Sequence, residues 1–173
     1  MFSGQRSRRL TLAVLFAVLI FISKTFLPTP VDKVLVVFQA LFLGLGSMML
    51  APFGATLVST IGGLLTSLWR APFALFTLGF AVLYGILVDA FLMLLRAKAE
   101  NGTVRTTRIV AGVTIATATT GIVSYYTSVY LLSLLPRNIV LEASILIIGV
   151  ISGLAGGYLA SLLWNKTLRH LLS

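Results

Sequence analysis

Long hydrophobic stretches, separated by short polar or proline-containing segments, run along the whole chain. A helix that crosses about 30 Å of hydrocarbon needs about 20 mostly apolar residues. The five prolines fall at or between the ends of the stretches, so the interior of each stretch can be helical. The pattern predicts an all-α integral membrane protein, one domain over residues 1–173 whose six transmembrane helices lie at residues 10–27, 34–50, 54–69, 72–95, 109–135 and 139–163.

Composition indicates that lipid, and not water, surrounds most of this chain. Hydrophobic residues make up 58% of the sequence and charged residues only 10%. A soluble domain of this size would need many more charged side chains to cover its surface. We therefore expect a multi-pass protein of the plasma membrane, in contact with the lipid bilayer.

The basic residues predict how the chain is oriented. Lys and Arg total 13 against 4 Asp and Glu, a net charge of +9. Nine of the 13 lie before the first stretch, between the fourth and fifth stretches, or after the last one. Because Lys and Arg are retained on the cytoplasmic side, both termini are predicted to be cytoplasmic. The same placement between hydrophobic stretches argues against nucleic-acid binding.

Residues that support catalysis or metal binding are scarce. There is no cysteine, and the single histidine, His170, follows the last hydrophobic stretch. The four carboxylates are scattered over different segments and make no recognisable cluster for a metal or for acid–base chemistry. We therefore expect no enzymatic activity, no bound metal and no cofactor.

Polar and aromatic residues gather near the predicted outer ends of the helices. Aromatic walls with one or two charged groups are typical of a pocket for a small polar molecule. The alternative is an interfacial belt, because Trp and Tyr favour the depth of the lipid headgroups. Arg70 and Arg137 would suit an anionic group of a ligand and Glu142 a cationic one, which favours a metabolite of mixed polarity. The candidate substrate-binding residues are Gln39, Trp69, Arg70, Tyr126, Tyr130, Asn138 and Glu142.

The fifth predicted helix carries a hydroxyl face. Thr117, Thr120, Ser124 and Ser128 are spaced by three or four residues, which places them on one side of a helix. Such side chains can line a binding site. They can equally bond to carbonyl groups of their own helix in an ordinary packed face, and the sequence leaves both interpretations open.

Asp89 lies well inside the fourth stretch, about two turns from its cytoplasmic end. A carboxylate at that depth costs a few kcal/mol unless it has a partner or a proton. One interpretation gives Asp89 a conformational or coupling role. The other has it extend toward a nearby loop base such as Arg96.

Strips of small residues predict close helix contacts. Gly149, Gly153 and Gly157 share one face of the last stretch, and Ala13 and Ala17 share one face of the first. Small residues at a spacing of four let helix backbones approach each other in a membrane. On this ground alone, both strips are expected to pack inside the bundle.

The size, six spans, basic N-terminus, Ala13 and Ala17, and the stretch at residues 52–65 together resemble the substrate-binding S components of energy-coupling factor (ECF) transporters. The resemblance implies that a vitamin, its precursor or a metal ion binds on the outer side. It also implies that Ala13 and Ala17 dock on a transmembrane coupling subunit, and that two cytoplasmic ATPases supply the energy. No residue set matches the binding signature of one vitamin, and the histidine-bearing N-terminus of the cobalt and nickel branch is missing.

Two other functions remain open at this point. A scaffold protein similar to the MreD cell-shape family would have a similar size and span count, and would act through protein contacts without a ligand. A small secondary transporter or channel is less favoured, because Asp89 is the one ionisable group deep in a stretch. Retention of a ligand would separate the importer subunit from the scaffold.

Overall fold

The computed structural model describes residues 3–25, 36–50, 52–69, 71–97, 103–133 and 137–168. A short 3-10 turn precedes α5, and π-helical turns at Thr127–Leu131 and Trp164–Leu168 continue α6 and α7. The prediction of an all-helical chain is confirmed. The first helix was predicted to begin at residue 10 but begins at Ser3, so the polar residues before the apolar stretch are also helical. The six α-helices of the described residues are α1 (Ser3–Thr25), α3 (Val36–Met49), α4 (Gly54–Trp69), α5 (Ala74–Leu94), α6 (Thr106–Tyr126) and α7 (Ile139–Leu163).

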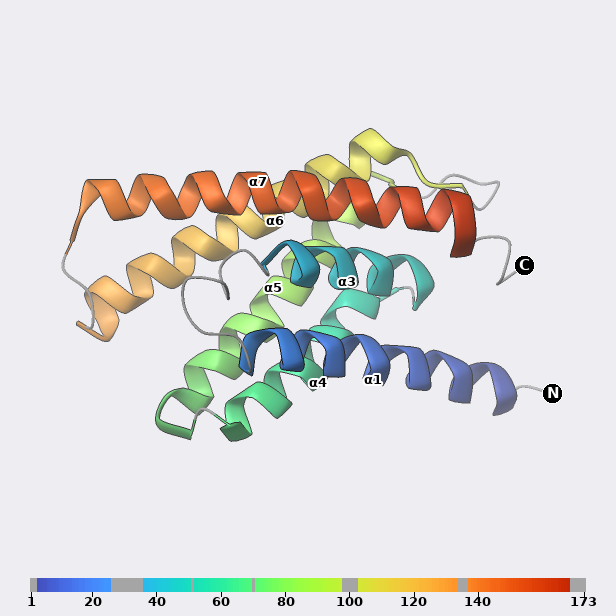
Figure 1. Cartoon of the computed structure of the whole chain (residues 1–173), viewed down its shortest axis with the longest axis horizontal. Helices are drawn as coiled ribbons and strands as arrows, with labels where there is room; N and C mark the ends of the chain where they lie inside the picture. Colours follow the sequence, from blue (N-terminus) through green and yellow to red (C-terminus); the bar gives the residue numbers. More distant parts are fainter. Residues whose placement is uncertain are drawn as a thin grey trace.

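The helices form a bundle in which successive helices run in opposite directions, and α1 begins at the end where α7 finishes (Figure 1). The most extensive contacts are between α6 and α7 and between α4 and α5, and α1 packs mainly on α4. At the shared end, the side chain of Asn165 bonds to both the backbone N–H and the carbonyl of Val104, with distances of 3.2 and 3.1 Å. We call this end the basic end, because Arg105, Arg108 and Lys166 lie there, and the opposite end the far end.

Helix α3 occupies the centre of the bundle. Its residues from Gln39 to Met48 are buried except for the half-buried Phe42. A helix that is buried on all sides needs apolar residues around its whole circumference, and α3 has that composition. It contacts all five other α-helices, which cover this middle part of α3.

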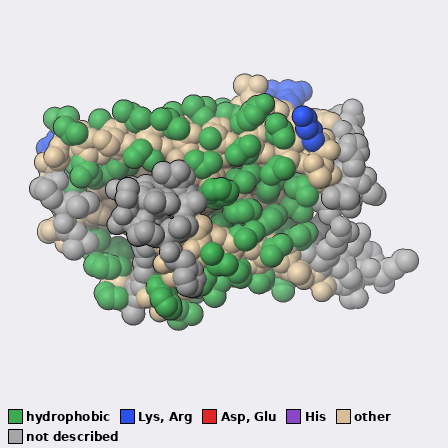
Figure 2. Space-filling view, viewed as in Figure 1, with side chains coloured by type: hydrophobic (Ala, Val, Ile, Leu, Met, Phe, Trp, Pro, Cys, Tyr) green, Lys and Arg blue, Asp and Glu red, His purple; other side chains and the backbone are tan. Residues whose placement is uncertain are grey.

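Three helical segments are long and apolar enough to cross a membrane: Ala74–Leu94, Thr106–Leu131 and Ile139–Leu168. Helices α3 and α4, with 14 and 16 residues, are shorter, and the apolar part of α1 covers Leu10–Thr25. Figure 2 shows hydrophobic side chains across the middle of one face, with the visible Lys and Arg side chains near its ends. An apolar outer surface of this kind matches the helices of a membrane protein.

The glycine strip of α7 packs against the backbone of α6. A Cβ atom added at Gly153 would lie 2.5 Å from the Cα of Thr114, and one at Gly157 would lie 3.0 Å from the Cα of Val110. Only a residue without a side chain permits such an approach. The predicted close packing of this strip is confirmed, and the structure identifies α6 as its partner.

Candidate functional site

A cavity of about 460 Å³ lies in the far half of the bundle. Its described lining comes from the end of α1, the starts of α3, α5 and α7, and the second half of α6. A volume of this size is typical of a pocket for a small metabolite. We call it the main cavity. Its lining residues are Lys24, Val36, Gln39, Thr77, Phe80, Ala81, Tyr84, Thr117, Thr120, Gly121, Ser124, Leu141, Ser144, Ile145, Ile148 and Gly149.

Gln39 lies in the wall of the main cavity near the start of α3. Its side chain is buried, with 6% exposed, and its amide makes no hydrogen bond to any other residue in the described part of the chain. Because Gln39 lines the cavity, its amide is open to a water molecule or a ligand there. Because an amide has both donors and an acceptor, Gln39 can bind either kind of polar group.

Tyr84 faces Thr117 across the cavity wall, and both side chains are buried. Their hydroxyl oxygens lie 2.7 Å apart, and the Thr117 hydroxyl donates to the carbonyl of Val113 at 2.7 Å. Since Thr117 has a single hydroxyl proton, Tyr84 is the donor in this pair. Sequence reasoning missed Tyr84, although a tyrosine in the middle of an apolar helix, away from the headgroup region, is a usable signal.

The hydroxyl face predicted on α6 fulfils both of the roles left open. Thr117, Thr120 and Ser124 line the main cavity, and Ser128 lines a smaller one beside it. Each of these hydroxyls also donates to a carbonyl three or four residues earlier in the same helix. The face is therefore a site lining whose protons already have partners within α6.

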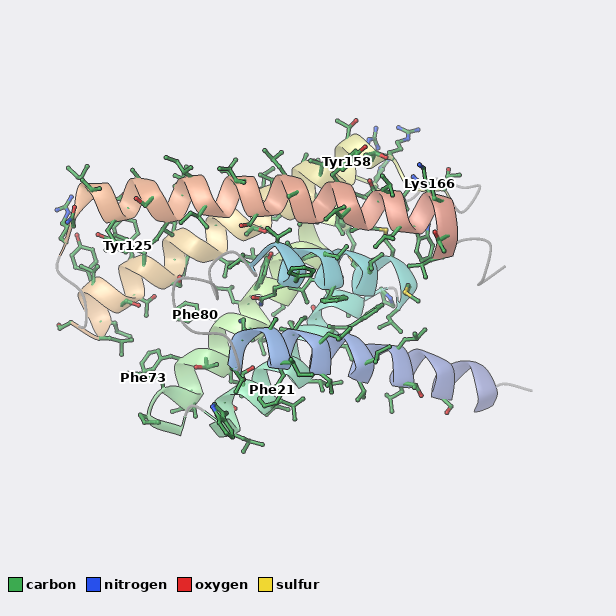
Figure 3. The ribbon with its side chains drawn as sticks, in the orientation of Figure 1. Phe21, Phe73, Phe80, Tyr125, Tyr158 and Lys166 are labelled. Carbon is green, nitrogen blue, oxygen red and sulfur yellow. The ribbon has the colours of Figure 1, made fainter. Side chains whose placement is uncertain are left out.

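The smaller cavity, of about 240 Å³, adjoins the main one on the far side. Thr77, Phe80 and Ser124 line both cavities, and Phe73 and Phe76 add further aromatic surface to the smaller one. Figure 3 shows Phe73 close to the far end of the bundle and Phe80 deeper along α5. The two cavities are thus neighbours, and Phe80 borders both of them.

Four of the predicted site residues form a cluster at the corner between α6 and α7 and do not line the main cavity. The Tyr126 hydroxyl donates to a carboxylate oxygen of Glu142 at 2.6 Å, and the ring of Tyr126 stacks on that of Tyr130 with centroids 5.9 Å apart. The side-chain oxygen of Asn138 accepts from the N–H of Val140 at 2.9 Å and caps α7. These residues bind one another and stabilise the far-end corner.

The remaining predicted pocket residues also lie away from the cavity or outside the described part. Trp69, at the end of α4, is 66% exposed and does not line either cavity in the described chain. Arg70 lies outside the described residues. Of the six predicted substrate-binding residues that the structure describes, Gln39 is therefore the one that lines the main cavity.

Tyr125 holds the same corner from inside, between α6 and α7 (Figure 3). It is 2% exposed, and its hydroxyl donates to the Asn138 carbonyl at 3.1 Å and accepts from the Asn138 N–H at 3.0 Å. We expect Tyr125→Phe to lower the free energy of unfolding by about 1–2 kcal/mol, since both bonds are lost in a buried setting. Denaturant titration in detergent measures this loss.

Tyr130→Phe is the matched control for that substitution. Tyr130 is 62% exposed and its hydroxyl makes no hydrogen bond among the described residues, while the ring stacking survives in phenylalanine. Its unfolding midpoint should therefore equal that of the parent. Equal midpoints for both variants would show that the Tyr125 hydroxyl does not stabilise the corner.

Asp89 is hydrogen-bonded to the first turn of α4, and not to Arg96. The carboxylate is 2% exposed and accepts hydrogen bonds from the backbone N–H of Ala55 at 3.2 Å and of Thr56 at 2.8 Å. The Thr56 hydroxyl donates a third bond at 2.8 Å. The first turn of a helix has unpaired N–H groups and the positive end of the helix dipole, so Asp89 acts as a cap for α4 supplied by α5.

Ala13 and Ala17 lie inside the bundle. Both are 0% exposed, and a Cβ atom at Gly62 of α4 would lie 3.3 Å from the carbonyl oxygen of Ala17. The strip is thus used for packing α1 on α4, as small residues alone would predict. A coupling subunit cannot contact these two side chains in this arrangement, and any such contact would need another surface.

A second hollow of about 450 Å³ lies at the basic end, away from the main cavity. Its wall is mostly apolar, and Arg96 and Ser47 are its polar members in the described chain. Nearby, Arg108 donates to the carbonyls of Leu95 and Arg96 at 2.9 and 3.3 Å and so caps the end of α5. These bonds fix the basic end without adding polar groups to the hollow.

Neither a cluster of metal ligands among the described residues nor a similar known protein points to a function. Within the residues that the structure describes, no group of three or more His, Cys, Asp or Glu side chains is placed to hold a metal ion. The sequence matches no family model, and no curated protein or solved structure is similar to it. The function must therefore be argued from the geometry of the bundle and its cavities.

Proposed function

We propose that this chain is the membrane-embedded, substrate-binding subunit of an importer of the ECF type, with a vitamin or a related small metabolite as its substrate. The observation that supports the proposal is the main cavity, which has the volume of a metabolite pocket and is lined by Gln39, whose amide makes no hydrogen bond to another described residue. A scaffold that acts through protein contacts has no need of such a cavity.

The position of the cavity fits uptake from outside the cell. We propose that all six helices cross the plasma membrane and that the basic end is cytoplasmic, since Lys and Arg are retained on that side. The far half of the bundle then faces the exterior, where a substrate arrives. The smaller aromatic cavity would lie on the route between the exterior and the main cavity.

The energy for uptake would come from other subunits. The sequence has no phosphate-binding loop of the Walker type, so ATP hydrolysis needs separate ATPases. We propose two cytoplasmic ATPases and a transmembrane coupling subunit as partners. Because Ala13 and Ala17 are buried, the coupling subunit would contact a different part of the surface, such as the exposed apolar side of α1 that includes Leu15 and Ile22.

Ligand retention is the direct test of the proposal. We expect native mass spectrometry of the detergent-purified protein to show one small metabolite bound per chain. Gln39→Leu should weaken its binding about tenfold, the equivalent of about 1.4 kcal/mol, because the amide hydrogen bonds to the ligand are lost. Thr11→Val, an exposed change on α1 at the basic end, should leave the Kd unchanged.

The absence of any bound ligand would contradict the importer subunit. A folded protein that is reproducibly empty, and that binds no member of a panel of vitamins and precursors, would favour the scaffold function. Ion flux through proteoliposomes that contain this chain alone would instead favour a channel.

Orientation can be measured separately, because the native chain has no cysteine and each introduced thiol is unique. Arg105 lies at the basic end, Arg137 lies at the far end, and both are exposed. We expect a membrane-impermeant maleimide to label Arg137→Cys in intact cells and to label Arg105→Cys only after permeabilisation. Labelling of both positions from the same side would contradict an alternating six-span arrangement.

A further inference from the structure

The hollow of about 450 Å³ at the basic end, which we call the basic-end hollow, has a buried apolar wall and an exposed rim. Leu92, Val104 and Ile109 are buried in the wall, whereas Met93 and Arg96 on the rim are exposed. A cavity of this volume holds a small molecule or part of a larger one. Met93 belongs to the long apolar segment of α5 and Arg96 follows it, so the hollow lies where the apolar part of α5 ends.

Arg96 occupies a backbone position that glycine usually takes. The N–H of Arg96 donates to the carbonyl of Met93, and the N–H of Ala97 donates to that of Leu92, both at 3.0 Å. This pair of bonds ends a helix with one residue in the left-handed conformation, which is most often glycine. Here that residue is Arg96, with a φ of 47°. Because a side chain is strained in this conformation, an arginine here indicates a use for its side chain.

The guanidinium of Arg96 is available to an anion. It makes no hydrogen bond or ion pair with another described residue. The two carboxylates in the described part of the chain are engaged elsewhere, Asp89 with the first turn of α4 and Glu142 with the far-end corner. The rim of the hollow thus has a cation without a described counter-ion. Further cations of the described chain lie at the same end: Arg105, Arg108 and Lys166.

We propose that the basic-end hollow binds one anionic phospholipid, with part of an acyl chain against its apolar wall and the headgroup phosphate on Arg96. A guanidinium and a phosphate form charge-assisted hydrogen bonds, and basic residues beside an apolar helix attract anionic headgroups. A free phosphate compound would use Arg96 alone, whereas a lipid also uses the apolar wall. The hollow is separate from the main cavity, so this site does not rest on the importer function.

Native mass spectrometry of the delipidated, full-length protein in an uncharged detergent tests the lipid site, with each probe added in a titration. Dioleoylphosphatidylglycerol is anionic, dioleoylphosphatidylcholine has the same chains but is zwitterionic, and glycerol phosphate has no chains. We expect the first phosphatidylglycerol to bind about tenfold more tightly than phosphatidylcholine, because the basic end attracts net negative charge. Glycerol phosphate should show no binding at the same concentrations.

Arg96→Gln locates the headgroup. We expect it to weaken phosphatidylglycerol about tenfold, so that the two lipids bind equally. Arg96→Gly should weaken phosphatidylglycerol as much without lowering the thermal unfolding midpoint, since glycine suits the left-handed backbone. Lys166→Gln is the matched control, because it removes the same charge at the same end from a residue outside the hollow (Figure 3). It should keep the Kd of phosphatidylglycerol within about twofold of the parent value.

Met93→Trp locates the acyl chain. A large ring on the rim narrows the entrance to the hollow, and both residues of this comparison are exposed, so the fold should be retained. We expect both lipids to bind about tenfold more weakly, the effect of excluding about two methylene groups of the chain. Leu94→Trp is the control, since Leu94 is 75% exposed and does not line the hollow. It should change neither affinity.

Any of four results would overturn the lipid site. The first is that no lipid is retained, or that phosphatidylcholine binds as tightly as phosphatidylglycerol. The second is unchanged binding of phosphatidylglycerol by Arg96→Gln, and the third is unchanged lipid binding by Met93→Trp. The fourth is glycerol phosphate binding as tightly as the lipid, which would make the hollow a site for free phosphate compounds. Lipids and small metabolites differ in mass, so these results are distinct from the test of the main cavity.

Discussion

Gly85→Ala is expected to leave little correctly folded protein. A Cβ atom at position 85 would collide with the side-chain oxygen of Ser59, and would lie 2.7 Å from the Cα of Thr56 and 2.8 Å from the carbonyl oxygen of Ala55. Two of these neighbours are backbone atoms of α4 and cannot turn aside. We expect a loss of about 3 kcal/mol or more in the free energy of unfolding, the upper range for overpacking a tight contact.

Gly79→Ala is the control, in the same helix. A Cβ atom at Gly79 meets no atom within 4 Å, so alanine adds helix propensity without a clash. Its stability should be unchanged or higher by about 0.5–1 kcal/mol. Size-exclusion chromatography and thermal unfolding in detergent compare the two variants. If Gly85→Ala proves as stable as Gly79→Ala, the close approach of α4 and α5 at this point is incorrect.

Removing the carboxylate of Asp89 is expected to have the second largest effect. Asp89→Leu leaves the N–H groups of Ala55 and Thr56 without their acceptor in a buried setting and removes the charge that faces the start of α4. We expect the free energy of unfolding to fall by about 3 kcal/mol. Asp89→Asn keeps one acceptor oxygen and should lose about half as much.

Thr56→Val measures one of the three bonds by itself, since only the hydroxyl that donates to Asp89 is removed. It should cost about 1 kcal/mol. Denaturant titrations of the three variants form a graded series. A stability of Asp89→Leu equal to that of the parent would show that the carboxylate does not cap α4.

The same series separates a structural role of Asp89 from a coupling role. Asp89 does not line the main cavity, so the folded fraction of Asp89→Asn should bind ligand with the parent Kd. If Asp89→Asn abolishes the proposed uptake while stability and Kd are unchanged, Asp89 takes part in coupling. A loss of transport that only follows the loss of folded protein would assign it to the fold.

Gly85 and Asp89 are four residues apart and therefore lie on one face of α5. Together they place the first turn of α4: glycine lets the backbone come close, and the carboxylate binds the N–H groups that arrive there. From the sequence, Asp89 stood out as a charge in an apolar helix, whereas Gly85 was not distinguished from the other glycines of the chain. Only the packing of α4 on α5 shows that they serve one contact.

Site residues were predicted unevenly for a related reason. Gln39 was predicted because it is a polar residue near the outer end of its stretch, and the α6 hydroxyls were predicted from their spacing to share one face, as a site lining or as a packed surface. Tyr126 and Glu142 were assigned to a pocket because they share the far end, but they bond to each other at the corner. Their position along the helix axis was predictable, while the direction in which each side chain points depended on neighbouring helices.

By itself the sequence determined the properties that depend on neighbours along the chain. Hydrophobic stretches specified the helices, and the residue spacing specified which small residues share a face, as for Gly153 and Gly157 of α7. Tertiary structure alone decided what each face meets: α6 for that glycine strip, α4 for Ala17, and the α4 N-terminus for Asp89. Periodicity follows from the geometry of one helix, whereas a cavity or a cap requires segments distant in sequence to pack together.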